Sequence, residues 1–216
     1  MLFVCFSLHS ATISIRCKLG GIALEQEQKQ FLKKLVTEGR ETAFDWIEYW
    51  WKFSSFDTWQ FWVNILMLTV PLIILYFKID RTKAFHLGFF GYSVHILFTY
   101  FDTTLVRFGL ISYPYQAIPI LHVNFGLDVS LIPVSFMLLY QWTLNNKKNF
   151  YLYGTLLSGF LAFIFKPILK SHNLIEWHLW ANVLYLFIFY VIIIVLSKWV
   201  TNLFSYFEYR GKKIPD

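Results

Sequence analysis

The sequence predicts an all-α protein, a polytopic bundle of about five transmembrane helices preceded by an amphipathic helix. Of its 216 residues, 57% are hydrophobic and 15% are charged, whereas a soluble domain carries about 25% charged residues. The acidic residues are also unevenly placed, because only four of the 13 lie between Trp59 and Ser197. A water-soluble surface cannot be built from this composition, so we expect the centre of the chain to lie in lipid.

The first 57 residues are expected to lie outside the bundle. Residues 1–21 begin with an apolar stretch that no basic residue precedes, so they match a signal peptide poorly and their status stays open. From 22 to 57, apolar side chains recur at helical spacing with lysines and glutamates between them, as in an amphipathic helix. Its apolar face ends in tryptophans just before the first span. We therefore expect it to lie on the membrane surface rather than against a partner, with Gly39 as a candidate break.

Apolar runs then follow one another through the bundle region, residues 58–199. A run of about 20 residues, at about 1.5 Å per residue, crosses the roughly 30 Å of bilayer hydrocarbon. The expected spans are about 58–77, 84–102, 118–144, 150–166 and 177–197. Tryptophans fall near their ends, as in an aromatic belt, and residues 200–216 form a basic C-terminal tail.

The segment from Phe108 to Leu127 is uncharged and long enough to cross, but it contains two prolines and two glycines. Backbone that faces lipid must satisfy its own hydrogen bonds, which such a segment cannot do as a straight helix. The sequence therefore predicts a loop or re-entrant piece that leads into the third span. A sixth crossing is the alternative.

The basic residues punctuate the ends of the apolar runs. The formal net charge of +6 does not form a continuous patch, so nucleic acid is not an expected partner. Basic residues near the spans are more numerous on the face that carries the tail, which predicts a cytoplasmic C-terminus. Counting every N-terminal basic residue removes this bias. Cys5 and Cys17 predict neither a disulfide framework nor a zinc site.

Small residues at helical spacing predict two faces where helices approach closely. They are Gly88 and Gly91 in the second span, and Gly154, Ser158 and Ala162 in the fourth. Lys166 continues the second row, and we expect its ammonium to reach the membrane interface. Ile192 and Ile193 lie in a run that is expected to face lipid.

Two aspartates, Asp102 and Asp128, lie in or at the ends of apolar runs. A charged aspartate at mid-membrane depth costs about 2.5 to 3.5 kcal/mol even on the lenient insertion scale. Asn124 lies one turn before Asp128, and Pro133 leaves the carbonyl of Val129 without its helical donor. Broken helices of this kind hold cations or relay protons. The candidate polar site comprises His95, Asp102, Asn124 and Asp128.

The same aspartates also have a structural interpretation. Asp102 would then end its helix in the headgroup zone, and Asp128 would be protonated or hydrogen-bonded to a neighbouring helix, since burial favours the neutral carboxyl. The sequence leaves both interpretations open.

A string of residues around the third span resembles a known family. It consists of Tyr113-Pro114, Pro119, Asn124, Asp128, Pro133 and Tyr140-Gln141, with Asp102 and Gly109-Leu110 also fitting. From about Trp59 to Trp199 the chain is similar to small, uncharacterised multi-span integral membrane proteins of spore-forming Gram-positive bacteria, bacilli and clostridia. Residues 1–40 fall outside the resemblance. It implies a bacterial cytoplasmic membrane and carries no activity.

Insertion and helix packing account for every strong signal, which favours a non-enzymatic membrane protein with an accessory or structural role. A transporter or channel for a cation, proton or small polar solute is the alternative. An intramembrane enzyme that uses His95 with an aspartate as acid and base is a second alternative. No motif predicts a catalytic residue, a metal site or a cofactor. The lipid bilayer is the expected partner, and another membrane protein or a second copy is an open alternative.

Overall fold

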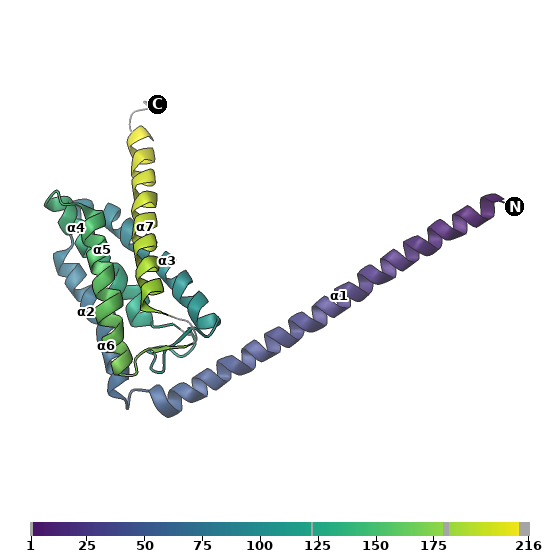
Figure 1. Ribbon diagram of the computed structural model, residues 1–216, viewed down its shortest axis with the longest axis horizontal. Helices are drawn as coiled ribbons and strands as arrows, with labels where there is room; N and C mark the ends of the chain where they lie inside the picture. The colour runs from purple at the N-terminus through teal and green to yellow at the C-terminus, as the bar shows by residue number, and fades with distance from the viewer. Residues whose placement is uncertain (1, 122, 179–181, 212–216) are drawn as a thin grey trace. The chain divides into compact units, whose positions relative to one another are not determined.

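A computed structural model of the protein describes residues 2–121, 123–178 and 182–211 (Figure 1). It confirms the all-α fold, because almost all regular structure is helical and the two strands have two residues each. The chain divides into two units, residues 1–48 and residues 49–216. The first unit is a single helix, and the second is the transmembrane helix bundle.

The N-terminal helix, α1 (Leu2–Tyr49), is longer than the predicted amphipathic helix. It begins at Leu2, within the segment whose status the sequence left open, and it runs through Gly39 without a break. A single glycine costs only about 1 kcal/mol in a helix, and the flanking residues are good helix formers. Ion pairs one turn apart, Lys29–Glu25 and Lys34–Glu38, support the helix.

Within the described residues, five long helical stretches make up the bundle. They are α2 (Trp59–Lys78), α3 (Ala84–Arg107), η3 (Gly126–Leu131) with α4 (Ile132–Asn145), α5 (Phe150–Phe160) with η4 (Leu161–Phe165) and α6 (Lys166–Ser171), and α7 (Val183–Gly211). The segments η3 and η4 are π-helical turns, as is η1 (Trp50–Ser54) before the bundle, and η2 (Arg81–Lys83) is a 3-10 turn.

Four of these stretches are long and apolar enough to cross a membrane. Within the described residues they are Trp59–Lys78, Gly126–Asn145, Phe150–Ser171 and Val183–Arg210. At 24 residues, α3 is also long enough but is not one of the four, so its crossing stays a prediction. The third and fifth stretches begin at 126 and 183, later than the predicted 118 and 177.

Backbone pairing explains the later start of α7. Strand β1 (Ile111–Ser112) pairs antiparallel with β2 (Glu176–Trp177), so the residues predicted to open the fifth span form a ribbon instead. The described residues between Arg107 and Phe125 contain no helix. The predicted loop is therefore present, and the sixth crossing is not found in them.

Helix α3 packs against both α4 and α7. Its side chains Leu87, Phe90 and Val94 are fully buried. The ring of Phe90 meets those of Tyr140 and Phe150 with centroids 4.5 and 5.4 Å apart. These contacts join α3, α4 and α5 through aromatic packing.

The α2–α3 and α4–α5 turns lie at one end of the bundle, together with the end of α7 (Figure 1). Gln141 ties the first turn to α4, because it accepts from the Asp80 N–H at 2.8 Å and donates to the Lys78 carbonyl at 2.9 Å. The Thr82 hydroxyl and then the Thr82 N–H donate to the Asp80 carboxylate, which lowers the pKa of Asp80 below its usual range. The β1–β2 ribbon closes the opposite end.

The predicted small-residue faces differ in what they contact. A Cβ added to Gly91 would lie 2.8 Å from Met137 Sδ, and one added to Gly154 would lie 2.7 Å from Ile194 Cδ1, so both glycines lie at helix contacts. Ser158 and Ala162 are also fully buried. An added Cβ at Gly88 meets nothing within 4 Å, so Gly88 does not lie at a close contact.

The run near the middle of α7 was expected to face lipid, and this is correct for only one of the two residues named. Ile192 is 44% exposed, whereas Ile193 is 5% exposed and belongs to the core. Adjacent helical residues differ by about 100° around the helix axis, so a uniformly apolar run cannot be assigned to one face by sequence alone.

Replacing Gly154 with leucine is expected to lower the thermal stability of the purified protein in detergent, because the new side chain enters the contact with Ile194. Gly159 lies on the same helix, and its nearest neighbour to an added Cβ is 3.8 Å away. Gly159→Leu is therefore the matched control and should change the melting temperature less. If both variants lost the same stability, the helices would not approach more closely at Gly154 than at Gly159.

Candidate functional site

Five fully buried polar side chains meet near the ribbon end of the bundle, and we call them the polar cluster. They are Asp102, Tyr113, Asp128, Lys166 and Tyr190, each at most 1% exposed. They come from α3, the loop after β1, η3, the first residue of α6, and α7. The cluster thus joins segments that are up to 88 residues apart in the chain.

A chain of hydrogen bonds links three of its members. The Tyr113 hydroxyl donates to Asp102 Oδ1 at 2.7 Å. Lys166 Nζ donates to the same hydroxyl oxygen at 3.4 Å and lies 5.6 Å from the centroid of the Tyr113 ring. The lysine ammonium therefore stabilises the Asp102 carboxylate directly, by charge, and indirectly, through the Tyr113 hydroxyl that donates to it.

Asp128 completes the cluster. Its carboxyl lies close enough to that of Asp102 for a hydrogen bond, and both carboxyls interact electrostatically with Lys166. Carboxylate oxygens only accept, so two ionised carboxylates cannot bond to each other. Accordingly, Asp102 Oδ2 and both Asp128 side-chain oxygens have no hydrogen-bond partner among the described residues. The Tyr190 hydroxyl, which faces the same pair, has none in that part of the chain either.

The π-helical turn η3 sets the position of Asp128. The Ile132 N–H bonds to the Leu127 carbonyl, five residues back. In this register the Asp128 carbonyl would bond to Pro133, which has no N–H. His95 Nδ1 lies 2.8 Å from that carbonyl and donates to it when Nδ1 carries the proton. His95 thus supports the backbone of Asp128 rather than its carboxyl.

This geometry corrects the expectation for Pro133. In an α-helix the carbonyl without a donor would be that of Val129, four residues back, as the sequence predicted. The extra residue of the π turn moves the unpaired carbonyl to Asp128, where His95 satisfies it. Steric conflict between a proline ring and the preceding turn favours such a π turn.

The second π turn repeats the arrangement at Lys166. Turn η4 ends at Phe165, and the Lys166 N–H bonds to the Leu161 carbonyl, five residues back. Pro167 follows directly, as Pro133 follows Ile132 after η3. Both ends of the Asp128–Lys166 interaction are therefore placed by a π turn that a proline terminates.

Lys166 does not extend to the membrane interface as predicted. It is 1% exposed, because the helix continues to Ser171 and so places Lys166 within the bundle rather than at its edge. Its partners Asp102 and Tyr113 supply the charge and the acceptor that compensate its burial.

Asn124 does not join the carboxyls either. Its amide Nδ2 donates to Asn64 Oδ1 at 2.8 Å, and its Oδ1 accepts from the Leu127 N–H at 3.1 Å. Its backbone carbonyl accepts from the Asp128 N–H at 3.0 Å. Asn124 therefore fixes the start of η3 against α2. Of the four predicted site residues, Asp102 and Asp128 meet through their side chains, and His95 and Asn124 hold the backbone beside them.

The loop that carries Tyr113 is tied to the segment before α2. Gln116 Nε2 donates to the Tyr113 carbonyl at 3.2 Å, and the Gln116 N–H donates to Ser54 Oγ at 2.9 Å. Trp50 Nε1 donates to the Gln116 carbonyl at 2.8 Å, and Asn64 Nδ2 donates to the Tyr115 carbonyl at 2.9 Å. These bonds hold the Tyr113 hydroxyl over Asp102.

Sequence reasoning missed Asn64, Tyr113, Lys166 and Tyr190 as parts of this site. A signal existed for two of them. Asn64 is the one strongly polar residue between Trp62 and Phe77, and Lys166 lies immediately before a proline in a predicted span. Tyr113 precedes Pro114 in the string that carries the family resemblance, but nothing local marks it or Tyr190 as a site residue among the 13 tyrosines of the chain.

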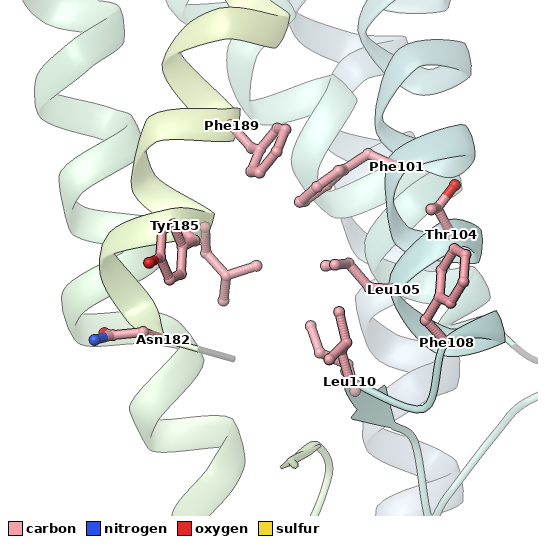
Figure 2. Close-up of a pocket in the computed structure, with 10 residues that line it drawn as sticks. Phe101, Thr104, Leu105, Phe108, Leu110, Asn182, Tyr185 and Phe189 are labelled. Carbon is pink, nitrogen blue, oxygen red and sulfur yellow. The ribbon is translucent and has the colours of Figure 1, made fainter. Parts of the chain in front are cut away.

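An apolar groove of about 610 Å³ lies near the cluster, between the end of α3 and the start of α7. Figure 2 shows Phe101 and Phe189 facing each other across one end of it and Leu110 at the other end. The two rings stack with centroids 4.0 Å apart. Their chain neighbours are Asp102 and Tyr190, but the residues that line the groove include no member of the polar cluster.

The polar cluster can bind a proton or another small cation through its carboxyls. Over the described residues, no set of three or more His, Cys, Asp or Glu side chains is placed to bind a metal ion. No family model, no curated protein and no solved structure matches the chain.

Proposed function

We propose that the protein is a non-enzymatic transporter or channel for a proton, a cation or a small polar solute, with the polar cluster as its binding site. One observation carries this proposal. Two acidic side chains and one basic side chain, Asp102, Asp128 and Lys166, are fully buried together in a bundle of membrane-spanning helices.

The energetic cost of this arrangement argues against a purely structural role. Burying an ion costs several kcal/mol after relaxation, by rough estimates, and apolar residues of the same volume often stabilise a core as well or better. Ionisable groups inside a membrane are accordingly associated with ion pathways and proton relays. A site with more acidic than basic groups also attracts a positive charge.

An accessory or structural role is the second candidate, and a specific observation favours it. His95 is hydrogen-bonded to the Asp128 carbonyl, and Asn124 is hydrogen-bonded to the Asn64 side chain. Tyr113, on a loop that several hydrogen bonds hold in place, donates to Asp102. An enzymatic role has less support, because the His95 ring bonds to a backbone carbonyl instead of to a carboxylate that could act with it.

We propose the cytoplasmic membrane of a spore-forming Gram-positive bacterium as the setting, on the basis of the resemblance described above. Lipid is the expected partner of the α1 segment, whose apolar side chains Phe31, Leu35 and Phe44 are at least half exposed. Another membrane protein or a second copy stays an alternative partner.

The C-terminus is expected to be cytoplasmic. A reporter that is active only in the cytoplasm should work when fused after Asp216, and also after Lys148 in the α4–α5 turn at the same end of the bundle. A fusion after Arg107, at the opposite end, is the control and should be inactive. Labelling of the C-terminal tail from outside intact cells would contradict the proposed orientation.

Replacing Asp128 with asparagine is expected to abolish transport while leaving the protein folded. The amide keeps the size and hydrogen bonding of the side chain but cannot exchange a proton or neutralise a cation. The measurement is ion and proton flux in vesicles reconstituted with the purified full chain, alongside folded yield. Asp80→Asn, at the far end of the bundle, is the control and should keep wild-type flux. If wild-type vesicles show no more flux than empty ones for protons and monovalent cations, the accessory role is favoured.

A further inference from the structure

We propose that Asp102 and Asp128 share one exchangeable proton, so that the polar cluster is a one-proton site with Lys166 as its fixed counter-charge. This inference rests on the proposed transport function and deepens it, because it names the proton as the ion that the site binds. It follows from two independent counts, one of charges and one of hydrogen bonds.

The ionisable side chains of the cluster include one more acid than base. Two carboxylates and one ammonium, all at most 1% exposed, carry a net charge of minus one when all three are ionised. The other groups that face them, Tyr113 and Tyr190, are neutral phenols. His95 faces Asp128 from α3, but its Nδ1 is committed to the backbone carbonyl. One bound proton makes the cluster neutral, which burial strongly favours.

The hydrogen-bond count requires the same proton. Asp102 Oδ2 and the two Asp128 oxygens lack partners among the described residues, although the two carboxyls lie within hydrogen-bonding reach. A proton on Asp128 converts it to a donor, and Asp128 O–H then donates to Asp102 Oδ2. One added proton thereby turns a contact between two acceptors into a hydrogen bond.

The surroundings decide which carboxyl holds the proton. Asp102 accepts from the Tyr113 hydroxyl at 2.7 Å, and that hydroxyl is in turn bonded to Lys166. Asp128 has no such donor among the described residues. The negative charge therefore stays on Asp102, and the chain runs from Asp128 O–H through the Asp102 carboxylate and the Tyr113 hydroxyl to Lys166.

The proton also fits this site better than a metal cation does. Sodium or potassium would require several oxygen ligands and would lie near the Lys166 ammonium, which repels it. On release, the Asp128 O–H bond breaks, its electron pair stays on the carboxyl oxygen, and a water molecule takes the proton as hydronium. The loss leaves two adjacent carboxylates, which repel each other and favour rebinding.

Infrared spectroscopy of the purified full chain tests the inference, because a protonated carboxyl has a C=O stretch distinct from that of a carboxylate and shifts in heavy water. At neutral pH the wild type should show the intensity of one buried protonated carboxyl. Asp128→Asn should lose it, and Asp102→Asn should lose it as well, since Asp128 then pairs with Lys166 as a carboxylate. Asp80→Asn is the control and should retain one.

Lys166→Met should double the signal, because neutrality then requires two protons. Should that variant fail to fold, the two aspartate variants still decide the matter. Absence of the wild-type band, its survival in Asp128→Asn, or its removal by added sodium or potassium chloride at constant pH would overturn the shared proton.

The outcomes also separate this inference from the proposed function. The expected band in a protein that passes no ions in vesicles would leave the shared proton standing and remove the transport function. Flux without the band would leave transport standing and remove the shared proton.

Discussion

Replacing Lys166 with methionine is expected to lower the free energy of unfolding by about 3 to 5 kcal/mol at neutral pH, the usual cost of removing one partner from a buried ion pair. Methionine fills a similar volume, so the loss comes from the charge and not from a cavity. Asp102 would keep its bond from Tyr113 but lose the ammonium that compensates its charge, so the cluster must bind a second proton to become neutral. Denaturant unfolding in detergent measures the loss.

Two further variants make this test specific. Lys170 is exposed and lies over the Trp177 ring at 4.8 Å, so Lys170→Met should cost at most about 1 kcal/mol. The double variant Lys166→Met with Asp102→Asn should regain most of the lost stability, because it removes both charges. If Lys166→Met were as stable as Lys170→Met, Lys166 would not be the counter-charge of the cluster.

The loss should also depend on pH, with a definite sign. Without the ammonium, the folded variant takes up a second proton, beyond the one that the wild type holds, and the unfolded chain holds neither at neutral pH. The folded state then binds more protons, so the free energy of unfolding increases as the pH falls. The difference between wild type and Lys166→Met should therefore shrink in acid.

Replacing Gly126 with alanine is expected to cost about 1 to 3 kcal/mol through overpacking. An added Cβ would lie 2.6 Å from the Asn64 carbonyl oxygen, with Met67 Cβ at 3.2 Å and the Leu68 nitrogen at 3.3 Å. Two of these three atoms are backbone, so α2 itself must shift. The shift would also disturb the bond between Asn64 and Asn124 that fixes the start of η3.

Gly88→Ala is the matched control, since an added Cβ there meets nothing within 4 Å. It should be neutral or stabilise by up to about 1 kcal/mol, because alanine favours a helix over glycine. The comparison uses thermal unfolding in detergent, together with ion flux in vesicles. If the two variants were equally stable, α2 could move away from η3 without a loss of stability, and the prediction would be wrong.

The bundle was predictable from sequence because its main signal is local. An apolar run of sufficient length predicts a helix whatever surrounds it, and four such runs form helices that are long and apolar enough to cross a membrane. The start of the fifth was not predictable, because Glu176 and Trp177 pair with a strand 65 residues away. Such pairing depends on tertiary structure.

The site was only half predictable for the same reason. Asp102 and Asp128 stood out because charge in an apolar run is costly wherever it lies. Lys166 fits an interfacial position by spacing, and only the continuation of its helix to Ser171 reveals that it is buried. Pro133 and Pro167 each break an α-helix, but sequence alone does not decide between a kink, a stop and a π turn.

The ties of the Tyr113 loop have a mechanical consequence. Trp50 and Ser54 hold Gln116 from one side, and Gln116 holds the Tyr113 backbone from the other. Because tryptophan settles at the height of the lipid headgroups, a thinner or stretched bilayer would pull on this linkage. Such a force would move the Tyr113 hydroxyl that donates to Asp102. We therefore expect bilayer thickness to change the proton affinity of the carboxyl pair.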